Sequence, residues 1–411
     1  EPSPRAKKAF DNGLIYWRIS EFDKAEKELR KAIELDPEYP EPYILLGDLT
    51  YDQGRLDEAI INYGLAIEVD SLHSPRLYYL LGRVYFDQKV YTDAIDWLTR
   101  YTGSDNARED LKDYAGDMIR LAAFRQSALA DPVPFEPVNL GPYVNTEHDE
   151  YVNSITLDES RLVYTLMQPD TVIEGHYTEG FALAVKTDTG WVVTGKALPD
   201  LAALGNIGAM SLTADGSFLF FTSCGAPVGH GSCDLYVSGK QGDGWSRPQN
   251  LGQVVNTSYW DSQPCFSADG KTLYFVSARP GGQGGSDIWT TIFEQGKGWT
   301  VPKNAGPAIN TSDEEMAPFI HPDGRTMYFS SKGHIGMGGF DLFISRMDTN
   351  GRWTEPENLG WPVNTEYNEI NMVVSTNGKG AYLSSRQEDG YGGYDIYRFD
   401  LPESLAPQQV S

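Results

Sequence analysis

The stretch SARPGGQGGSDIW, residues 277–289, has the composition of a phosphate-binding loop. Glycine-rich loops bind phosphate when a helix follows them, because the first N–H groups of the helix point at the anion. Here Asp287 and the run IWTTIF follow, and β-branched and aromatic residues favour a strand. Related stretches recur at 334–343 and 389–397, with a degenerate copy at 229–236 and a copy without the acid at 176–183. A feature that occurs five times is predicted to be architecture rather than a catalytic loop.

Four acids in a repeated position are the second candidate for chemistry. Each follows the asparagine of an Asn-Thr pair by five residues, and Ile207 interrupts the series of Glu150, Asp261, Glu315 and Glu369. One hypothesis places these carboxylates around a channel mouth, where they bind a cation or a basic partner segment. The other hypothesis has each acid capping backbone N–H groups nearby. No GxSxG, HExxH, EF-hand or CxxC pattern is present, so we predict no catalytic residue, no metal site and no cofactor.

Two of the three cysteines could form a disulfide. Cys224 and Cys233 flank the stretch GAPVGHGS, which we expect to connect two adjoining antiparallel strands. Such a hairpin can bring two cysteines within bonding distance, and an oxidising compartment would favour the bond. Cys265, in the apolar stretch PCF, is predicted to be a buried free thiol. The alternative is that all three cysteines simply fill the core.

Length and charge exclude several classes of protein. The chain has 411 residues, enough for two or three domains, and 58 acids against 33 basic residues give a net charge of −25. Residues 1–130 carry 17 basic and 24 acidic side chains, a net −7, which leaves −18 for the remainder. A field of this sign disfavours nucleic acid and anionic membrane surfaces as partners. No apolar run approaches the roughly 20 residues of a membrane span, so no transmembrane segment is predicted.

The first hundred residues repeat every 34 or 35 positions. Glycines, alanines and large apolar residues recur in register: Gly13, Gly47 and Gly82, Ala25, Ala59 and Ala94, and Phe22, Leu56 and Tyr91. The segment FDKAEKELRKAIELDP resembles the second helix of a tetratricopeptide (TPR) repeat, and the resemblance covers about residues 6–103. It implies three helix–turn–helix units, and residues 105–128 are predicted to form a capping helix.

TPR arrays form a concave groove from their first helices. Matching the family's positions one by one implies a partner-binding groove lined by Phe10, Trp17, Ile44, Tyr51, Tyr79 and Phe86. Such a groove accepts a partner helix or an extended peptide. Alternatively, these side chains only pack one repeat against the next.

The remainder of the chain repeats every 54 residues. This spacing separates Trp191, Trp245, Trp299 and Trp353, and also Asp215, Asp269, Asp323 and Asn377, each of which precedes a glycine. Four short strands per unit predict a propeller blade, and five units predict a five-bladed β-propeller over 135–404. The fifth unit lacks its last strand, and FEPVNLG at 135–141 is predicted to complete it and close the ring.

The repeat xxxDGxxLYFxSxxxxGxGGxDIY resembles the WD40-like PD40 repeats of TolB-type propellers. A TPR array (1–130), a linker (131–134), a propeller (135–404) and a tail (405–411) together resemble PorE-like lipoproteins of the Bacteroidetes type IX secretion system. That resemblance implies a periplasmic protein associated with the outer membrane, although the family's lipid-bearing cysteine is not in this chain. It also implies protein partners in an envelope secretion complex, with peptidoglycan bound only by a C-terminal domain that this chain lacks.

Two classes of function remain open. The first is a non-catalytic scaffold that binds protein partners through the TPR groove and a propeller face. The second is a propeller enzyme, a hydrolase or glycan-processing enzyme with its site at the channel mouth. An enzyme needs a nucleophile–base pair or paired acids that depart from the repeat. The acids found here follow the repeat, so the sequence favours the scaffold.

Overall fold

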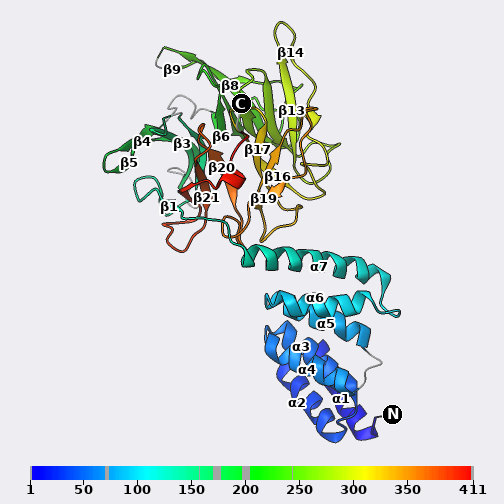
Figure 1. The fold of residues 1–411 in the computed structure, drawn as a ribbon. Helices are drawn as coiled ribbons and strands as arrows, with labels where there is room; N and C mark the ends of the chain where they lie inside the picture. The colour runs from blue at the N-terminus through cyan, green and yellow to red at the C-terminus, as the bar shows by residue number, and fades with distance from the viewer. Residues whose placement is uncertain are drawn as a thin grey trace. The chain divides into compact units, whose positions relative to one another are not determined.

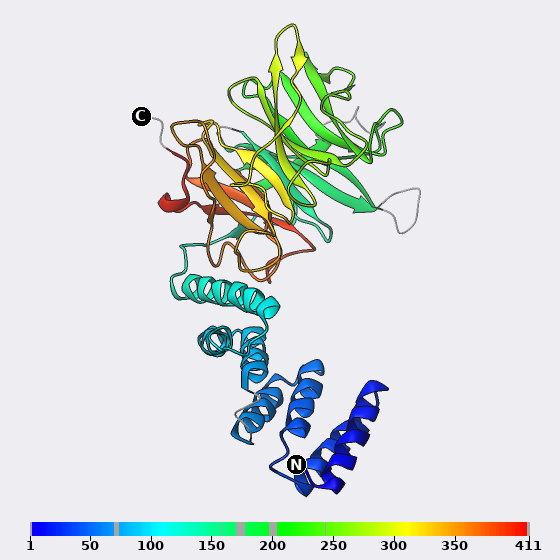
Figure 2. The same ribbon diagram turned by 90° about the vertical axis from the view of Figure 1, so that its right-hand side faces the viewer.

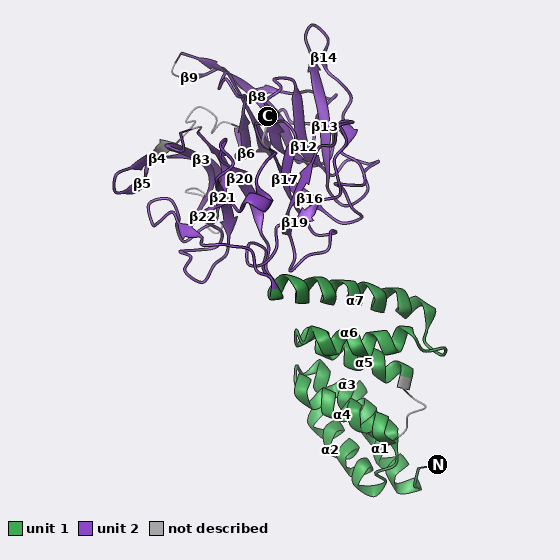
Figure 3. Cartoon of the chain, viewed as in Figure 1, with its two compact units in different colours: residues 1–130 green, residues 131–411 purple. Residues whose placement is uncertain are grey.

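The computed structural model describes residues 2–69, 74–156, 158–169, 177–196, 204–242 and 244–408. The chain divides into two compact units, residues 1–130 and 131–411, which are coloured separately in Figure 3. His176, in the copy predicted at 176–183, and residues 409–411 of the predicted tail lie outside the described residues. Each unit is considered by itself below.

The first unit is a series of antiparallel helix pairs (Figures 1 and 2). Seven helices occupy its described residues: α1 (Pro4–Arg18), α2 (Phe22–Leu35), α3 (Pro40–Asp52), α4 (Leu56–Val69), α5 (Ser74–Asp87), α6 (Tyr91–Thr102) and α7 (Glu109–Ala130). Proline begins α1 and α3, where the missing N–H costs nothing because the first N–H groups of a helix have no partner within it. No helix in the described ranges is long and apolar enough to cross a membrane.

The repeated glycines lie where the two helices of each pair cross. A Cβ added at Gly47 would lie 2.4 Å from the Tyr63 ring, and one added at Gly82 would lie 2.5 Å from Leu98. Gly13 meets Leu29 in the same way, at 2.9 Å. Glycine therefore recurs because a side chain from the second helix fills the space that its own Cβ would need.

Helix α7 covers the last repeat. It begins at Glu109, four residues after the predicted start, and buries Ala115, Met118 and Ala122. Ala115 and Met118 pack with Leu98 and Tyr101 of α6 in one apolar cluster. A helix in this position removes apolar surface that the final repeat would otherwise expose.

The second unit consists of five antiparallel sheets, the blades of a β-propeller (Figures 1 and 2). Blade one contains β2 (Glu150–Ile155), β3 (Arg161–Pro169), β4 (Tyr177–Thr187) and β5 (Gly190–Lys196). Blade two contains β6 (Asn206–Leu212), β7 (Phe218–Cys224), β8 (Cys233–Gln241), β9 (Gly244–Trp245) and β10 (Gln249–Asn250). Blade three contains β11 (Asp261–Phe266), β12 (Thr272–Ser277), β13 (Asp287–Glu294), β14 (Gly298–Trp299) and β15 (Lys303–Asn304).

The last two blades contain four strands each. Blade four contains β16 (Glu315–Ile320), β17 (Thr326–Ser331), β18 (Asp341–Arg346) and β19 (Glu357–Asn358). Blade five contains β20 (Ile370–Val374), β21 (Gly380–Ser385), β22 (Asp395–Asp400) and β1 (Val138–Asn139). The predicted fold class, a TPR array followed by a five-bladed propeller, is confirmed.

Blade five joins the two ends of the propeller. β1 pairs antiparallel with β22, with Val138 opposite Arg398 and Asn139 opposite Tyr397. The Phe135 ring also contacts the Phe399 ring edge-on, with 4.9 Å between the ring centroids. The strand that precedes blade one therefore completes the last blade, which leaves the ring without an open edge at that point.

One hydrogen-bond network accounts for the repeated asparagines. In blade three, Asp287 accepts from the Asn304 amide at 2.9 Å, and Asn304 accepts from the Asn310 amide at 2.8 Å. Asn310 also bonds the backbone N–H and C=O of Ile288. The same network links Asp234, Asn250 and Asn256, then Asp341, Asn358 and Asn364, and finally Asp395, Asn139 and Asn145. Blades two to five thus each fix their outer strand and the loop to the next blade with buried amides.

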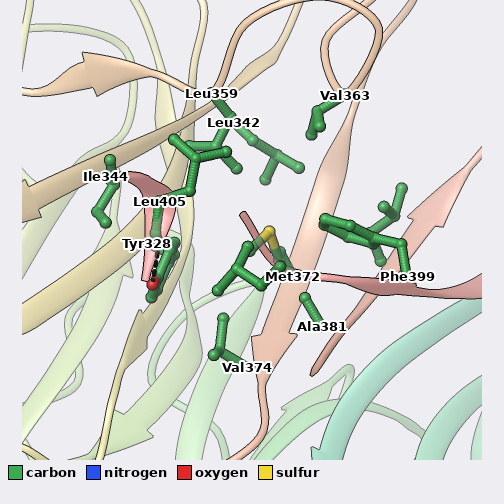
Figure 4. Close-up of a cluster of buried hydrophobic side chains, with 12 residues drawn as sticks. Tyr328, Leu342, Ile344, Leu359, Val363, Met372, Val374, Ala381, Phe399 and Leu405 are labelled. Carbon is green, nitrogen blue, oxygen red and sulfur yellow. Dashed lines mark hydrogen bonds between the residues drawn. The ribbon is translucent and has the colours of Figure 1, made fainter. Parts of the chain in front are cut away.

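The residues predicted as a linker and a tail are partly packed against the propeller. The N–H of Val133 donates to the carbonyl of Trp361 at 2.8 Å. Leu405, in the short 3₁₀ helix Glu403–Leu405, is buried in an apolar cluster with residues of blades four and five. Figure 4 shows the Tyr328 hydroxyl donating to the Leu405 carbonyl, at 2.7 Å. Leu405, the first residue of the predicted tail, therefore packs against the propeller, where its apolar side chain lies between residues of two blades.

Candidate functional site

The glycine-rich loops of blades two to five, all within the described ranges, have no free cradle for a phosphate. In blade three, Asp287 accepts from the N–H groups of Gln283 and Gly284, at 2.5 and 3.2 Å. The equivalent acids Asp234 and Asp341 each accept from two N–H groups of their own loops in the same way, and Asp395 accepts from the N–H of Tyr391. A carboxylate of the chain therefore occupies the position that an anion would need, and the predicted architectural role of the loop is supported.

The glycines also allow each loop to lie against the next blade. A Cβ on Gly284 would lie 1.8 Å from the Asp313 carbonyl oxygen, and one on Gly338 would lie 2.4 Å from the Thr365 carbonyl oxygen. Gly231 and Gly392 make the same close approach to the Asn-Thr loops that follow them in the ring. Glycine is required here because the neighbour is backbone, which cannot move aside as a flexible side chain can.

The four acids of the predicted channel-mouth ring are buried separately, each within its own loop. Each accepts from the backbone N–H and the hydroxyl of the threonine four residues earlier, at 2.5 to 3.1 Å, in the pairs Glu150–Thr146, Asp261–Thr257, Glu315–Thr311 and Glu369–Thr365. All four side chains are fully buried. Among the described residues, no three His, Cys, Asp or Glu side chains gather so as to hold a metal. The structure therefore favours local capping over the cation-binding ring.

Burial changes the electrostatics of these acids. Desolvation raises the pKa of Glu150 and of Glu369 to about 7, although the threonine donors act in the opposite direction. Asp261 is shorter by one methylene, and the Arg279 guanidinium fills the remaining space, 2.7 Å from the carboxylate. Arg279 also donates to the carbonyl of Val255 at 2.6 Å. We did not predict this role of Arg279 from the sequence. The sequence does show that Arg279 departs from the repeat, because blade four has Gly333 at the same loop position.

The innermost strands enclose a cavity of about 520 Å³. It begins beyond the four acids, at irregular positions of the strands where Ala209, Gln263, Ala317 and Asn371 have positive φ angles of 43° to 55°. Phe266, Pro264 and Phe319 contribute apolar surface. No charged side chain and no histidine lines this cavity within the described residues. It therefore presents neither a general base nor paired acids.

A backbone N–H of each of three innermost strands donates a hydrogen bond to a side chain of the preceding blade, and the accepting side chain differs in blade three. The N–H of Gln263 donates to the Thr222 hydroxyl of blade two at 3.0 Å, and the N–H of Ala209 donates to Thr165 of blade one at 3.2 Å. Blade three has Val276, which has no hydroxyl, at the position of Thr222. There the N–H of Ala317 donates instead to the Gln263 side chain, at 2.7 Å. Sequence analysis missed this role of Gln263.

Cys224 and Cys233 form a disulfide between β7 and β8, where they are directly paired residues. Cys265 is a free, buried cysteine that lines the central cavity. Burial raises the pKa of its thiol to about 11, which keeps it in the weakly nucleophilic protonated form at neutral pH.

The six residues of the predicted groove lie on the first helices of the three repeats. Ile44 is buried, and Phe10, Trp17, Tyr51, Tyr79 and Phe86 are partly buried. All six pack in apolar clusters that join neighbouring helices, so packing between repeats uses much of their surface.

Tyr51 links the second repeat to the third. Its hydroxyl donates to Asp87 at 2.5 Å, and the Arg83 guanidinium lies 4.2 Å from its ring centroid. The polar neighbours of the predicted groove therefore bond to the groove's own aromatic residue. We call the side of the first helices that carries the six predicted residues the inner face of the TPR array; Arg83 and Asp87 lie beside Tyr51 on it.

One of the six residues lines a cavity. Tyr79 borders a space of about 230 Å³ between α5 and the start of α7, together with Arg76, Arg108, Tyr101 and Asn106. Arg76 is paired with Asp48 and Arg108 with Asp110. The structure thus brings an aromatic ring and two guanidinium groups to one cavity, and the sequence did not indicate either arginine.

Comparison with known protein families identifies the first unit. Residues 13–54 match the family model described as TPR repeat, and residues 40–71 and 62–109 match models described as tetratricopeptide repeat. The first unit contains TPR repeats. The matched residues account for less than half of the chain, and a search of curated proteins finds no match.

Several solved TPR-type structures are similar to about a third of this chain. The TPR2B domain of yeast Sti1, in a complex with pHsp70, is 22% identical with a TM-score of 0.27, and the match covers 29% of this chain and 98% of that chain. The type III secretion chaperone SycD of Yersinia enterocolitica, with a peptide of the translocator YopD, is 15% identical with a TM-score of 0.28, over 30% of this chain and 96% of that one. The Sgt2 TPR domain from Aspergillus fumigatus is 16% identical with a TM-score of 0.28, over 34% and 93%.

Proposed function

We propose that this protein is a non-catalytic scaffold that binds protein partners through the inner face of its TPR array and through a face of its propeller. TPR and propeller folds are both suited to binding proteins. The observation that carries the proposal is how the polar side chains of the propeller repeat are used. The repeated acids and asparagines bond within their own blade, and the central cavity is lined by uncharged residues.

The inner face of the TPR array supplies the first binding surface of the proposal. Trp17, Tyr51 and Phe86 are only partly buried, so each retains surface that a partner could cover. Aromatic side chains in a groove contribute more to binding than other residue types because they bury large areas with few rotamers to restrict. Arg83 and Asp87 next to Tyr51 would add selectivity for the partner's polar groups.

The setting we propose is the periplasm, at the outer membrane, as part of a type IX secretion apparatus. The architecture resembles PorE-like envelope lipoproteins, in which a TPR array precedes a PD40-type propeller. The disulfide between Cys224 and Cys233 is compatible with that setting, because disulfides persist in oxidising compartments such as the periplasm. The net charge of −25 also favours protein partners over nucleic acid.

The test is cellular fractionation combined with chemical cross-linking. A tagged chain, expressed in its natural host from its own locus, should be found in the envelope fraction and cross-linked to secretion components. Recovery in the cytosol would contradict the proposed setting. Recovery in the envelope without any cross-linked protein would contradict the scaffold function.

A further inference from the structure

Blade five carries at one end a group of exposed tyrosines and acids that the repeat does not require. We propose that this surface, the tyrosine–acid patch, binds a segment of a partner protein rich in lysine and arginine. The patch comprises Tyr143, Glu147, Glu366, Tyr367, Glu388 and Tyr391. The inference rests on the scaffold function proposed above and names the chemistry of the partner that the propeller would bind.

The topology places these residues together. Tyr367 and Glu366 lie just before β20, Tyr391 and Glu388 lie in the loop between β21 and β22, and Tyr143 follows β1. β1, β22, β21 and β20 are successive strands of one antiparallel sheet, so all of these segments lie at the same end of it (β20, β21 and β22 are labelled in Figure 3). A Cβ added at Gly392 would lie only 2.4 to 2.7 Å from the backbone of residues 146–148. The loop that carries Tyr391 therefore lies against the loop that carries Glu147.

The three tyrosines are unusually accessible for aromatic residues. Tyr143 is 71% exposed, Tyr367 is 60% exposed and Tyr391 is 50% exposed. Large apolar groups gathered on an exposed surface mark interaction sites more often than single ones do. Tyrosine is well suited to this role because its ring buries much area with only two rotatable bonds.

Comparison of the blades shows that the propeller itself does not demand these side chains. The glycine-rich loop of blade five reads RQEDGYGGY, whereas blades three and two have ARPGGQGGS and CGAPVGHGS. Tyr391 occupies the position of Gln283 in blade three and of His230 in blade two. Neither of those two loops contains an acid between its flanking strands, so Glu388 departs from the repeat.

Charge decides the class of occupant. Glu147, Glu366 and Glu388 are exposed, and Asp389 beside them accepts from the Tyr397 hydroxyl at 3.0 Å. Two basic side chains lie nearby. The Arg386 guanidinium lies 4.6 Å from the centroid of the Tyr394 ring, and the His148 imidazole lies 3.8 Å from the Glu147 carboxylate. The surface is thus acidic and aromatic. Lysine and arginine complement this surface in two ways: they form ion pairs with the carboxylates, and their cations make cation–π contacts with the tyrosine rings.

The experiment measures binding of a fluorescent peptide of alternating arginine and glycine to the full chain. The matched probe has glutamate in place of arginine. We expect saturable binding of the arginine peptide that weakens as salt is added, and no binding of the glutamate peptide. The double variant Tyr367→Ser, Tyr391→Ser should weaken binding by about tenfold or more, and Glu388→Gln should reduce the salt dependence.

A matched control is available in blade three. Tyr259 occupies the position of Tyr367 and is 47% exposed, but its blade lacks the acids, so Tyr259→Ser should leave the affinity unchanged. An equal loss with Tyr259→Ser, equal binding of the two peptides, or no saturable binding would overturn the inference. Melting temperatures of the variants exclude loss of folding as the cause. If the peptide fails to bind while cross-linking still recovers envelope proteins, the scaffold function survives and only this inference falls.

Discussion

At the scale of single residues, the repeated acids show how burial determines what a carboxylate does. Glu369 is fully buried and accepts two hydrogen bonds from Thr365, and desolvation raises its pKa from 4.5 to about 7. The sequence indicated the position of this series correctly, and local capping was one of its two hypotheses. Burial could not be predicted, because it depends on how closely the Asn-Thr loop of one blade packs against the glycine-rich loop of its neighbour.

The raised pKa of Glu369 makes a prediction about pH. The folded chain holds this proton more tightly than the unfolded chain, so the stabilising contribution is fully present below about pH 4.5 and is lost as the pH rises through about 7. Glu369→Gln should therefore remove part of the decline in the free energy of unfolding over that window, by on the order of 2 kcal/mol. Urea unfolding at a series of pH values measures it. Glu355→Gln, at an exposed acid, serves as the control, and an unchanged pH profile for Glu369→Gln would contradict the explanation.

Gln263 allows a test by rescue. Gln263→Ala removes the acceptor of the Ala317 N–H and should lower the free energy of unfolding by about 1–3 kcal/mol, the cost of a buried donor without a partner. Adding Val276→Thr supplies the hydroxyl that blade two has at this position and should restore part of the loss. Val276→Thr alone should destabilise the protein, since its hydroxyl would be buried while Gln263 still accepts the bond. Additive effects of the two substitutions would show that the contact between blades works differently.

At the scale of elements, the two repeat periods predicted most of the architecture. A period of 54 residues with Trp and Asp-Gly in register is enough to place four strands per blade, because turns and alternating apolar residues recur with it. The packing of Leu405 and the irregular positions of the innermost strands were not predictable. Those features depend on contacts between blades, and a repeat pattern describes each blade singly.

We expect the two-residue strand β1, which completes blade five, to contribute measurably to the stability of the propeller. Asn139→Ala removes bonds to Asp395, Asn145 and the N–H of Gly141 at the one blade assembled from both ends of the propeller. We expect a loss of about 1–3 kcal/mol in the free energy of unfolding of the propeller, measured by urea titration with tryptophan fluorescence. Asn350→Ala, in an exposed turn, provides the control. Equal stability of the two variants would mean that β1 contributes little to closure.

The disulfide between β7 and β8 determines how many free thiols the protein should have. Intact protein, denatured without reductant, should show one titratable thiol, from Cys265, because Cys224 and Cys233 are bonded to each other. Cys265→Ser should reduce the count to zero. Three thiols in material produced in an oxidising compartment would show that the disulfide does not form and would weaken the proposed periplasmic setting.

At the scale of the whole molecule, the chain consists of two repeat units, and the repeated polar side chains of the propeller largely hold its blades together. We propose two surfaces that bind partners: the inner face of the TPR array and the tyrosine–acid patch of blade five. The sequence predicted the first surface through a family resemblance. It did not predict the second, because its residues come from three segments that the ring brings to one blade.

The most direct test of the central claim compares capture of envelope proteins by the parent chain and by two double variants. Trp17→Ala with Tyr51→Ala alters the inner face of the TPR array, and Ile61→Ala with Leu65→Ala alters exposed residues of α4 outside the predicted groove. Removing two large aromatic residues from a binding groove should reduce recovery of partners by about tenfold or more. The account predicts that loss for the first variant alone, with both variants folded as judged by circular dichroism. Unchanged recovery by the Trp17→Ala, Tyr51→Ala variant would contradict it.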